Sequence, residues 1–408
     1  MLAICYRKSI SRYLMMRTLT PYWTEIGTGN FSLIQLANIP DPPLPSEEWV
    51  RISPRVSGIC GSDLATIQGQ GSVYFSPFIS CPFVLGHEVV GDVTEIGSAV
   101  DGIQIGDRVT IEPALGCQVR GISPICPMCS QGNYANCENI TRGIIASGMQ
   151  TGYCQSTGGG WSHALVAHQS QLHRVPESLS DWEAVLIEPF SCAIHAVLKV
   201  DLQADQTVLV IGCGAIGLLT IAALRAVEFQ GRVVAIAKYP HQGEIAQTLG
   251  ADSVLYTSSK LYSEVSEVLN IESFQPELGK PVFTGGADCS FDCVASSTTL
   301  DDALRFTRPH GKVVLVGMPA VPHGVDWTSI WFKQLQVMGA YAYGIETYSE
   351  ERIHTFTLAM QLMQRLEGKL RCLITGCYKL PDYREALKAA MHPGHSKSIK
   401  TLFDLRED

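Results

Sequence analysis

Three glycines at fixed offsets interrupt a long uncharged run, TVLVIGCGAIGLLTIAALR, in which no charged residue occurs from Thr207 to Leu224. Such a run is long enough to cross a bilayer as a helix. However, Gly212, Gly214 and Gly217 spell G-x-G-x-x-G between a strand-like half and a helix-like half. In that pattern the first glycine permits a tight turn, the second lets the backbone approach a pyrophosphate, and the third lets the helix pack closely on the strand. The run therefore predicts a dinucleotide-binding strand and helix rather than a membrane span.

Strand-like and helix-like segments continue to alternate after this run. The segment RVVAIAK (232–238) precedes QGEIAQTLGAD, CSFDCVAS (289–296) precedes LDDALRFTRPHG, and KVVLVGMP (312–319) follows. Alternation at this spacing predicts βαβ units in a parallel sheet, an α/β domain. We assign Val316 and Met318, in the last segment, to the cofactor-binding set. A glycine-rich packing turn is the alternative to a cofactor site, but the strand-before and helix-after context favours the cofactor.

The N-terminal half has a different pattern, with short β-like runs separated by glycine and proline up to about residue 185. Turn signals between such runs predict an irregular β domain. A chain of 408 residues fits two domains. The formal net charge of −9 argues against a nucleic-acid partner, and no other segment resembles a membrane span.

The first sixteen residues, MLAICYRKSISRYLMM, carry Arg7, Lys8 and Arg12 and no acidic residue. Two interpretations remain open. The segment is a weak organelle-targeting presequence, or it is an unstructured extension, with Met15 or Met16 as the true start. We favour the second interpretation and treat residues 1–15 as an N-terminal extension.

Four of the fourteen cysteines form a cluster, and the others are scattered. Disulfide scaffolds are typical of short secreted chains, and this chain is neither short nor preceded by a convincing signal peptide. We therefore expect metal-bound thiolates in a reducing cytoplasm. The cluster consists of Cys117, Cys126, Cys129 and Cys137.

A second group of candidate metal ligands lies upstream, with Cys60 in GICGSD and His87 in GHEVVG. Taken singly, each is more often a buried structural residue. Together they offer thiolate and imidazole, both favoured ligands of Zn²⁺. A catalytic zinc needs three protein ligands and one open position, where a substrate oxygen is polarised.

GICGSD, GHEVVGDVTEIGSAVDGIQIGDRV and the glycine fingerprint together resemble the zinc-dependent medium-chain dehydrogenase/reductase family, in particular its sorbitol and threonine dehydrogenase branch. The resemblance extends from about Met16 to the end of the chain. It implies a GroES-like catalytic domain at 16–188, with a structural-zinc lobe. It also implies a Rossmann domain at 189–341 and a C-terminal return to the catalytic domain at 342–408.

The resemblance also implies roles for individual residues. Cys60 and His87 match the first two catalytic zinc ligands, and Glu188 in VLIEPFSC matches the third; Cys192 is its rival. Glu88 matches the adjacent glutamate that approaches or replaces a ligand during turnover. Asp63 matches the carboxylate that fixes the tautomer of the ligand histidine.

Ser62 matches the hydroxyl that hydrogen-bonds the reacting alcohol and accepts its proton. Family members often carry a histidine three residues later, which continues the proton path. Here that position is Ala65. The resemblance therefore names no final proton acceptor, and water or another group must replace the histidine.

The cysteine cluster matches the structural zinc lobe of the family imperfectly. The usual spacing is C-x₂-C-x₂-C-x₇-C; Cys126, Cys129 and Cys137 match its last three places, whereas Ser123 occupies the first. We expect Cys117 to complete a four-sulfur site across a short insertion. The alternative is a vestigial lobe with three free thiols.

NAD-binding relatives usually end the second Rossmann strand with an acid that hydrogen-bonds the adenosine ribose. In VVAIAKYPHQ that position is Ala237, followed by Lys238 and Tyr239, with His241 as a further donor. This substitution removes a charge that would repel a 2′-phosphate and adds a cation. We therefore predict NADP in preference to NAD; weak NAD binding without the acid is the alternative.

Taken together, the sequence predicts a dehydrogenase that moves a hydride between a polar alcohol and NADP. Alternatives are a carbonyl reductase that works mainly in reverse and a non-catalytic NADP-binding protein, although no zinc ligand is missing. A zinc-ribbon interaction module is disfavoured because the cysteine cluster is so small a part of the chain. The apolar segment LQVMGAYAY (335–343) suggests pairing of Rossmann edge strands in a homodimer or homotetramer.

Overall fold

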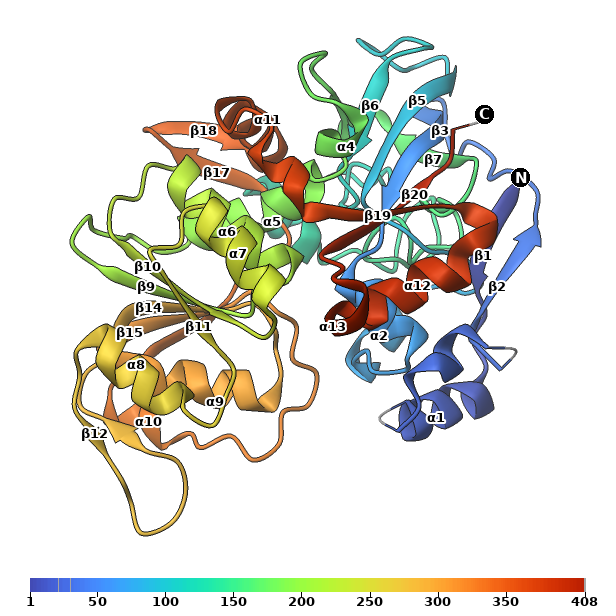
Figure 1. Ribbon diagram of the computed structural model, residues 1–408. Helices are drawn as coiled ribbons and strands as arrows, with labels where there is room; N and C mark the ends of the chain where they lie inside the picture. Colours follow the sequence, from blue (N-terminus) through green and yellow to red (C-terminus); the bar gives the residue numbers. More distant parts are fainter. Residues whose placement is uncertain (21, 30, 407–408) are drawn as a thin grey trace.

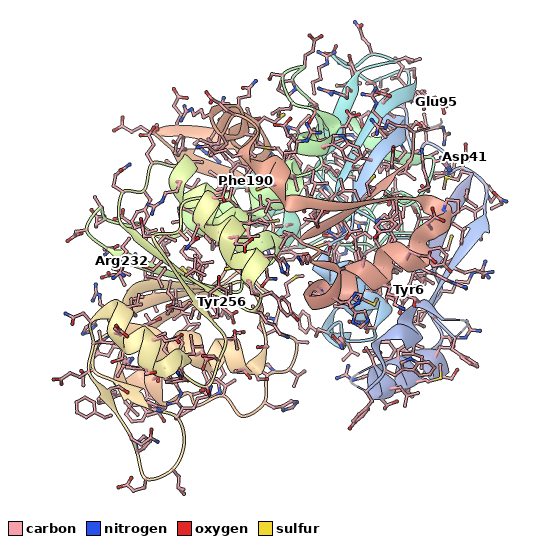
Figure 2. All side chains as sticks on the ribbon, in the orientation of Figure 1. Tyr6, Asp41, Glu95, Phe190, Arg232 and Tyr256 are labelled. Carbon is pink, nitrogen blue, oxygen red and sulfur yellow. The ribbon has the colours of Figure 1, made fainter. Side chains whose placement is uncertain are left out.

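The computed structural model describes residues 1–20, 22–29 and 31–406 of the chain. The molecule has two lobes, one built around a parallel sheet and the other around a mixed, mostly antiparallel sheet (Figure 1). Side chains fill both lobes and the space between the ribbons (Figure 2). Both sheets predicted from the sequence are therefore present.

The first lobe contains a parallel sheet of six strands in the order β11-β10-β9-β14-β15-β16. In chain order this is 3-2-1-4-5-6, the order of a doubly wound dinucleotide-binding fold. Its strands are β9 (Thr207–Ile211), β10 (Arg232–Ala237), β11 (Ser253–Tyr256), β14 (Ala287–Asp292), β15 (Thr307–Leu315) and β16 (Gln336–Gly339). A short hairpin of β12 (Ser273–Phe274) and β13 (Val282–Phe283) is attached to this lobe.

Helices cover both faces of this sheet because alternate residues of each strand point to opposite sides. Val208 and Val210 of β9 pack with one group of helices, and Leu209 and Ile211 pack with the other. This two-sided burial explains why the strand segments are almost wholly apolar. The helices are α5 (Ile187–Leu198), α6 (Ala215–Ala226), α7 (Pro240–Thr248), α8 (Leu261–Leu269), α9 (Ser297–Phe306) and α10 (Thr328–Phe332).

The second lobe is organised by a seven-stranded sheet in which β20, at the end of the chain, pairs antiparallel with β3. The register sets Leu402 opposite Gly58. Residues 400–404 therefore join a sheet whose other strands lie mostly before residue 175. The strands are β3 (Trp49–Gly58), β5 (Val89–Ile96), β6 (Arg108–Ile111), β7 (Leu165–His168), β8 (Leu172–Arg174), β19 (Ile374–Lys379) and β20 (Lys400–Asp404).

Shorter elements complete this lobe and its connections. A hairpin and helix α11, which packs on α5, precede the last strands. The elements are α2 (Gly61–Ile67), η2 (Val73–Phe78), α3 (Pro127–Ser130), η3 (Tyr134–Asn136), η4 (Gln169–Gln171), α4 (Asp181–Ala184), β17 (Ile345–Tyr348), β18 (Glu351–His354), α11 (Thr355–Arg365), η5 (Lys369–Leu373), η6 (Leu380–Asp382), α12 (Tyr383–Met391) and α13 (Pro393–Ser396).

The first residues of the chain are not unstructured, which corrects the expectation for residues 1–15. β1 (Leu2–Tyr6) lies between β2 (Ile34–Asn38) and β4 (Phe83–Val84) in a three-stranded sheet. Ala3 and Ile4 are fully buried. Helix α1 (Ile10–Leu19), which contains Met15 and Met16, and η1 (Thr24–Thr28) separate β1 from β2. The apolar run LAICY is ordered because IQLAN of β2 and the short strand β4 supply its pairing partners.

The uncharged run from Thr207 is divided between β9 and α6, as predicted. Among the described residues, none of the helices combines the length and the apolar character needed to cross a bilayer.

Candidate active site

Cys60 occupies the N-cap of α2, where the chain turns out of β3 and Ile59. Its backbone N–H donates a hydrogen bond to Asp63 Oδ2 at 3.0 Å. Asp63 is fully buried, and its second oxygen lies 3.5 Å from Nδ1 of His87. One carboxylate therefore positions both the cysteine and the histidine that the sequence singled out.

His87 and Glu88 lie directly before β5 and are 4% and 1% exposed. The ligand atoms of Cys60, His87 and Glu88 all lie within 4.8 Å of one another. Glu88 forms an ion pair with Lys400 of β20, which is itself only 3% exposed and also donates to the Ile59 carbonyl at 3.1 Å. The charge of Glu88 is thus already compensated by the protein.

Glu188 lies in the first turn of α5 and is 6% exposed. It is not part of the close group of Cys60, His87 and Glu88. Burial raises the pKa of Glu188 to about 7, and nearby His87 partly opposes this effect. Cys192 donates to Glu188 Oε1 at 3.8 Å, and Tyr343 lies close enough to this carboxylate to lower its pKa. Burial raises the pKa of the Cys192 thiol well above its usual range, which makes it a poor thiolate ligand.

The donor set fits a bound zinc ion. In the described part of the chain, no lysine, arginine or histidine forms an ion pair with Glu188, unlike Glu88. A buried carboxylate without a cation is costly unless a metal compensates it. Thiolate, imidazole and carboxylate are the ligands that zinc takes in catalytic sites.

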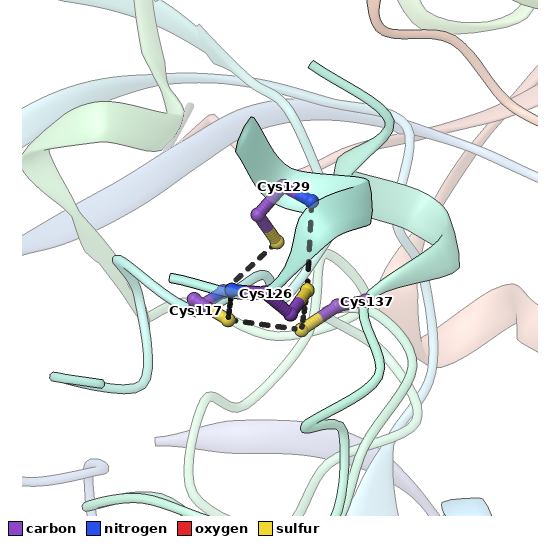
Figure 3. A group of neighbouring side chains, drawn as sticks. All are labelled: Cys117, Cys126, Cys129 and Cys137. Atoms are coloured by element: carbon purple, nitrogen blue, oxygen red, sulfur yellow. Dashed lines mark hydrogen bonds between the residues drawn. The ribbon is translucent and has the colours of Figure 1, made fainter. Parts of the chain in front are cut away.

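The four clustered cysteines are all buried, and their sulfur atoms lie within 4.8 Å of one another (Figure 3). Cys137 Sγ lies 3.5 Å from Cys117 Sγ and 4.0 Å from Cys126 Sγ. Zinc–sulfur bonds of about 2.3 Å in a tetrahedron give sulfur–sulfur edges of about 3.8 Å. The cluster therefore has the dimensions of a four-sulfur zinc site, and Cys117 is part of it.

Backbone N–H groups point at the sulfurs of this cluster. Cys117 N donates to Cys129 Sγ at 3.4 Å, Cys126 N to Cys117 Sγ at 3.3 Å, and Cys129 N to Cys126 Sγ at 3.5 Å. Such donors stabilise thiolates, the form in which cysteine binds a metal.

The glycine fingerprint forms the predicted strand–turn–helix. Gly212 follows β9 with a φ of 92°, which only glycine adopts without strain, and Gly214 is the N-cap of α6. A Cβ on Gly217 would overlap the carbonyl oxygen of Gly212, whereas a Cβ on Gly214 would meet no atom within 4 Å. The turn is therefore closed on the protein side and open where a phosphate would approach.

The other predicted cofactor residues follow β10 and β15, the strands on either side of the central pair β9 and β14, at the same end of the sheet. Lys238 and Tyr239 follow β10, and the Lys238 ammonium lies 5.4 Å from the centre of the Tyr239 ring. Val316 and Met318 follow β15. The carboxyl ends of β9 and β14 form the point at which the strand order reverses, where open α/β sheets bind their ligands.

Comparison with known proteins agrees with both lobes. The alcohol dehydrogenase GroES-like domain family matches residues 46–177, and the zinc-binding dehydrogenase family matches residues 215–363. A sorbitol dehydrogenase of Arabidopsis thaliana is 30% identical over 358 residues, which cover 87% of this chain and 88% of that protein. The chain belongs to the zinc-dependent medium-chain dehydrogenase/reductase family.

Two further relatives show how far the similarity of this dehydrogenase extends. An L-idonate 5-dehydrogenase of Vitis vinifera is 29% identical over 87% of the chain and 88% of that protein. The crystal structure of 2R,3R-butanediol dehydrogenase from Bacillus subtilis shares the fold, with a TM-score of 0.72, 24% identity and 99% coverage of both chains. The chain is thus a zinc-dependent oxidoreductase that acts on alcohol groups and uses a nicotinamide cofactor.

Two residues of the dehydrogenase site carry no signal in the sequence. Lys400 lies 312 residues from its partner Glu88. Tyr153 lies 87 residues from Thr66, yet its hydroxyl lies 3.0 Å from the Thr66 hydroxyl and near the Ser62 side chain. Only the fold brings these pairs together; a lone lysine or tyrosine in a strand or loop indicates nothing by itself.

A third group of potential ligands in the dehydrogenase has a structural explanation. Glu112, His173 and His354 lie together, and His354 Nε2 lies 3.0 Å from Glu112 Oε2. The other ring nitrogen of His354, Nδ1, accepts the backbone N–H of Phe356 at 3.2 Å. Nε2 therefore carries the proton and donates to Glu112. This hydrogen bond joins the end of β18 to the residue after β6.

Proposed function

We propose that this dehydrogenase oxidises a polar secondary alcohol or polyol with NADP. The observation that carries the proposal is the buried group of Cys60, His87 and two glutamates, together with a complete glycine fingerprint. When bound, zinc polarises the substrate oxygen and lowers the pKa of the alcohol, and the nicotinamide receives the hydride. The named sorbitol, idonate and butanediol dehydrogenases support a substrate that carries several hydroxyl groups.

For the catalytic metal we propose Cys60, His87 and Glu188 as ligands. Glu88 is not a ligand in this assignment, because its carboxylate forms an ion pair with Lys400. Glu88 forms an ion pair with Lys400, whereas Glu188 forms none with the described residues, and this difference supports the assignment. For the structural metal we propose Cys117, Cys126, Cys129 and Cys137, supported by their sulfur–sulfur distances.

Metal analysis of matched variants tests both assignments. The parent protein should contain two zinc ions per chain, and Cys126→Ser should contain one while it retains some turnover. Glu188→Gln should lose the catalytic zinc, whereas Glu88→Gln should keep it. A parent value of one that Cys126→Ser leaves unchanged would contradict the structural site, and equal zinc loss in the two glutamine variants would contradict the choice of Glu188.

For the chemistry we propose that Ser62 accepts the alcohol proton. We also propose that Glu88, which forms an ion pair with Lys400, adjusts the negative charge near the metal. Ser62 is half-buried on the first turn of α2, two residues after the ligand Cys60, which supports its approach to the substrate oxygen. The alcohol therefore meets a proton acceptor at the place where the metal polarises it.

The preference for NADP rests on the end of β10. Ala237 is fully buried and offers no carboxylate, whereas Lys238 is exposed and follows it directly. His241 stacks on Tyr239 with ring centres 5.7 Å apart and adds a second possible donor. Loss of one charge repulsion and gain of one charge-assisted contact is worth about 1.5–3 kcal/mol, or roughly tenfold to a hundredfold in preference.

The ratio of kcat/KM for NADP⁺ to that for NAD⁺ tests this proposal in the parent, Lys238→Ala and Ala237→Asp proteins. We expect a ratio above one in the parent, a lower ratio in Lys238→Ala, and a reversal in Ala237→Asp. A parent that prefers NAD⁺, or a ratio that Lys238→Ala leaves unchanged, would show that the assignment is wrong.

The substrate class is tested by measuring NADPH formation with D-sorbitol, L-idonate, 2R,3R-butanediol and simple primary alcohols. The polar diols and polyols should give the higher kcat/KM. The reverse reaction with D-fructose, the ketone of D-sorbitol, tests the carbonyl reductase alternative. We also retain as proposals the domain boundaries at 16–188, 189–341 and 342–408, a cytoplasmic location, and a homodimer or homotetramer.

A further inference from the structure

The proposed reaction releases a proton inside a buried site, and the chain lacks the histidine that often conducts it away. The position three residues after Ser62 is Ala65, whose methyl group can neither accept nor donate a proton. The neighbouring hydroxyl of Thr66 is half-buried on the same helix. Some other group must therefore connect Ser62 to solvent.

Tyr153 has the position that such a group requires. It is 7% exposed, its hydroxyl lies 3.0 Å from Thr66 Oγ1, and the Ser62 side chain lies near it. Its ring is held between Phe83, at a centroid distance of 5.2 Å, and His87, at 6.3 Å. The hydroxyl is therefore held beside the Thr66 turn of α2, and Ser62 lies one helical turn earlier on the same face of that helix.

The outer end of this chain of hydroxyls lies near the surface. The segment Gln68 to Gly71 lies just after Thr66 and contacts the end of α1. There the Thr20 hydroxyl donates a hydrogen bond of 3.2 Å to the Gln68 carbonyl oxygen. A Cβ on Gly71, which is itself partly exposed, would lie 4.0 Å from Thr66 Oγ1. A proton that reaches Thr66 is thus one short step from exposed chain.

We propose that Tyr153 relays the alcohol proton from Ser62 to Thr66 and so replaces the missing histidine. This inference rests on the proposed function. The alcohol O–H bond breaks as its proton bonds to Ser62 Oγ, the Ser62 proton passes to Tyr153, and the Tyr153 proton passes to Thr66. Thr66 releases its own proton to water, so each hydroxyl ends with one proton. The electron pair of the broken C–H bond leaves with the hydride to the cofactor.

Tyr153 acts here as a neutral hydroxyl and not as a base. A tyrosine hydroxyl has an ordinary pKa of about 10 and therefore keeps its proton at neutral pH. A neutral hydroxyl can accept one proton while it donates another. Tyr343 is another buried tyrosine, but it lies near the Glu188 carboxylate on α5 and not near Ser62 on α2.

The experiment compares Tyr153→Phe with Tyr6→Phe and Thr66→Val in the full-length zinc-loaded protein. Tyr6 is a matched control because it is 6% exposed and stacks at 4.8 Å on Phe83, the same ring that Tyr153 contacts. The alcohol is D-sorbitol, or whichever alcohol of the panel above gives the highest kcat/KM. Zinc content and NADPH binding by fluorescence are measured for every variant.

We expect kcat to fall about a hundredfold in Tyr153→Phe, the lower end of the range for loss of positioned proton transfer. KM for the alcohol, zinc content and NADPH affinity should stay within a factor of about two of the parent, since the phenylalanine ring keeps the packing. Proton transfer should become rate-limiting, so the solvent isotope effect in D₂O should rise while the isotope effect of a deuterated C–H bond falls. Thr66→Val should show the same pattern more weakly, and Tyr6→Phe should show none of it.

Three results would overturn the proposal. In the first, kcat and both isotope effects are the same in Tyr153→Phe as in the parent. In the second, the loss of kcat comes with an unchanged solvent isotope effect, or with loss of zinc or NADPH binding, as a purely structural role requires. In the third, the parent oxidises none of the alcohols with either cofactor, which would overturn the proposed function as well. A parent that is active only with NAD⁺ would contradict the cofactor assignment alone, and the relay would then be tested with NAD⁺.

Discussion

At the scale of single residues, the site is organised by buried charges that compensate one another. Glu88 and Lys400 are 1% and 3% exposed and form an ion pair between the start of β5 and the start of β20. Neither charge could remain buried alone, because transfer of an unpaired ion from water to the protein interior costs several kcal/mol. The pair therefore couples the last strand of the chain to the group of Cys60, His87 and Glu88.

Removal of one member of this pair should cost more than removal of both. We expect Lys400→Met to lower the free energy of unfolding by about 3–5 kcal/mol, because it leaves the Glu88 carboxylate uncompensated. The double variant Glu88→Gln, Lys400→Met should recover part of that loss. Denaturant unfolding at fixed zinc concentration measures both, and equal losses in the single and double variants would show that the two charges do not interact.

His173 predicts a pH dependence of stability. Burial, with a smaller contribution from nearby His354, lowers the pKa of His173 to about 3. The unfolded chain, with an ordinary histidine pKa of about 6.5, therefore binds the proton more readily than the folded chain below that pH. The stabilisation is fully present above pH 6.5 and is lost as the pH falls from 6.5 toward 3.

His173→Phe should remove this dependence while the aromatic stacking on Phe356, at 4.9 Å, is kept. Between pH 7.5 and 5.5 the parent should lose about 1 kcal/mol more than the variant, or about 2 °C in Tm. Thermal unfolding at both pH values measures the difference. His323→Phe, at an exposed histidine, is the control and should follow the parent; a His173→Phe protein that also follows the parent would contradict the prediction.

The sequence predicts site residues that belong to a local motif and misses those that depend on tertiary contact. Cys60, Asp63 and His87 stand in short segments whose spacing is recognisable, and the structure brings them together. Lys400 and Tyr153 approach them from distant strands and loops. No local pattern distinguishes that lysine or tyrosine from any other.

At the scale of elements, the strand–turn–helix of β9 and α6 gives the three glycines separate tasks. Gly217 faces the Gly212 carbonyl oxygen, so its missing side chain serves packing within the protein. Gly214 faces open space, so we expect its missing side chain to leave room for a ligand. The same substitution at the two positions should therefore have opposite consequences.

We expect Gly217→Ala to destabilise the fold by about 1–3 kcal/mol, because the added methyl group overlaps backbone. Gly214→Ala should leave Tm close to that of the parent, since its φ of −75° suits alanine, but should weaken NADPH binding. Thermal unfolding and NADPH fluorescence titration separate the two effects. Normal NADPH affinity in Gly214→Ala would show that the cofactor does not approach this turn.

Elements that the sequence predicts well have their partners nearby in the chain. β9, α6, β10 and α7 follow one another with short connections, and each apolar run has the period of its structure. β1 was missed because its partner β2 follows about thirty residues later, beyond α1. A five-residue apolar run carries too little periodicity to distinguish a strand from an unstructured end.

At the scale of the whole molecule, the parallel sheet ends in the edge strands β11 and β16. Among the described residues, β16 pairs with β15 on one side and with no strand on the other. Ala340 donates its N–H to Leu315 of β15 at 2.9 Å. Because successive residues of a strand point their N–H groups to opposite sides, the N–H groups of Val337 and Gly339 face away from the sheet.

An exposed edge of this kind readily pairs with another chain. The neighbouring helix α10 adds apolar surface, since Trp331 and Phe332 are 70% and 67% exposed. We therefore expect two copies of the chain to pair through β16 across a two-fold axis, with α10 against the partner. This edge is the reason to predict a homodimer or homotetramer.

Gly339→Pro tests this prediction because proline removes only an outward N–H and no hydrogen bond to β15. A Cβ on Gly339 would meet no atom within 4 Å, so the substitution has room. Gly339→Ala is the matched control, since it adds a side chain but keeps the N–H. Light scattering after gel filtration should give a multiple of 44.4 kDa for the parent and for Gly339→Ala, and half of that mass for Gly339→Pro, with an unchanged circular dichroism spectrum. A monomeric parent, or a Gly339→Pro protein of unchanged mass, would show that this edge does not hold the oligomer together.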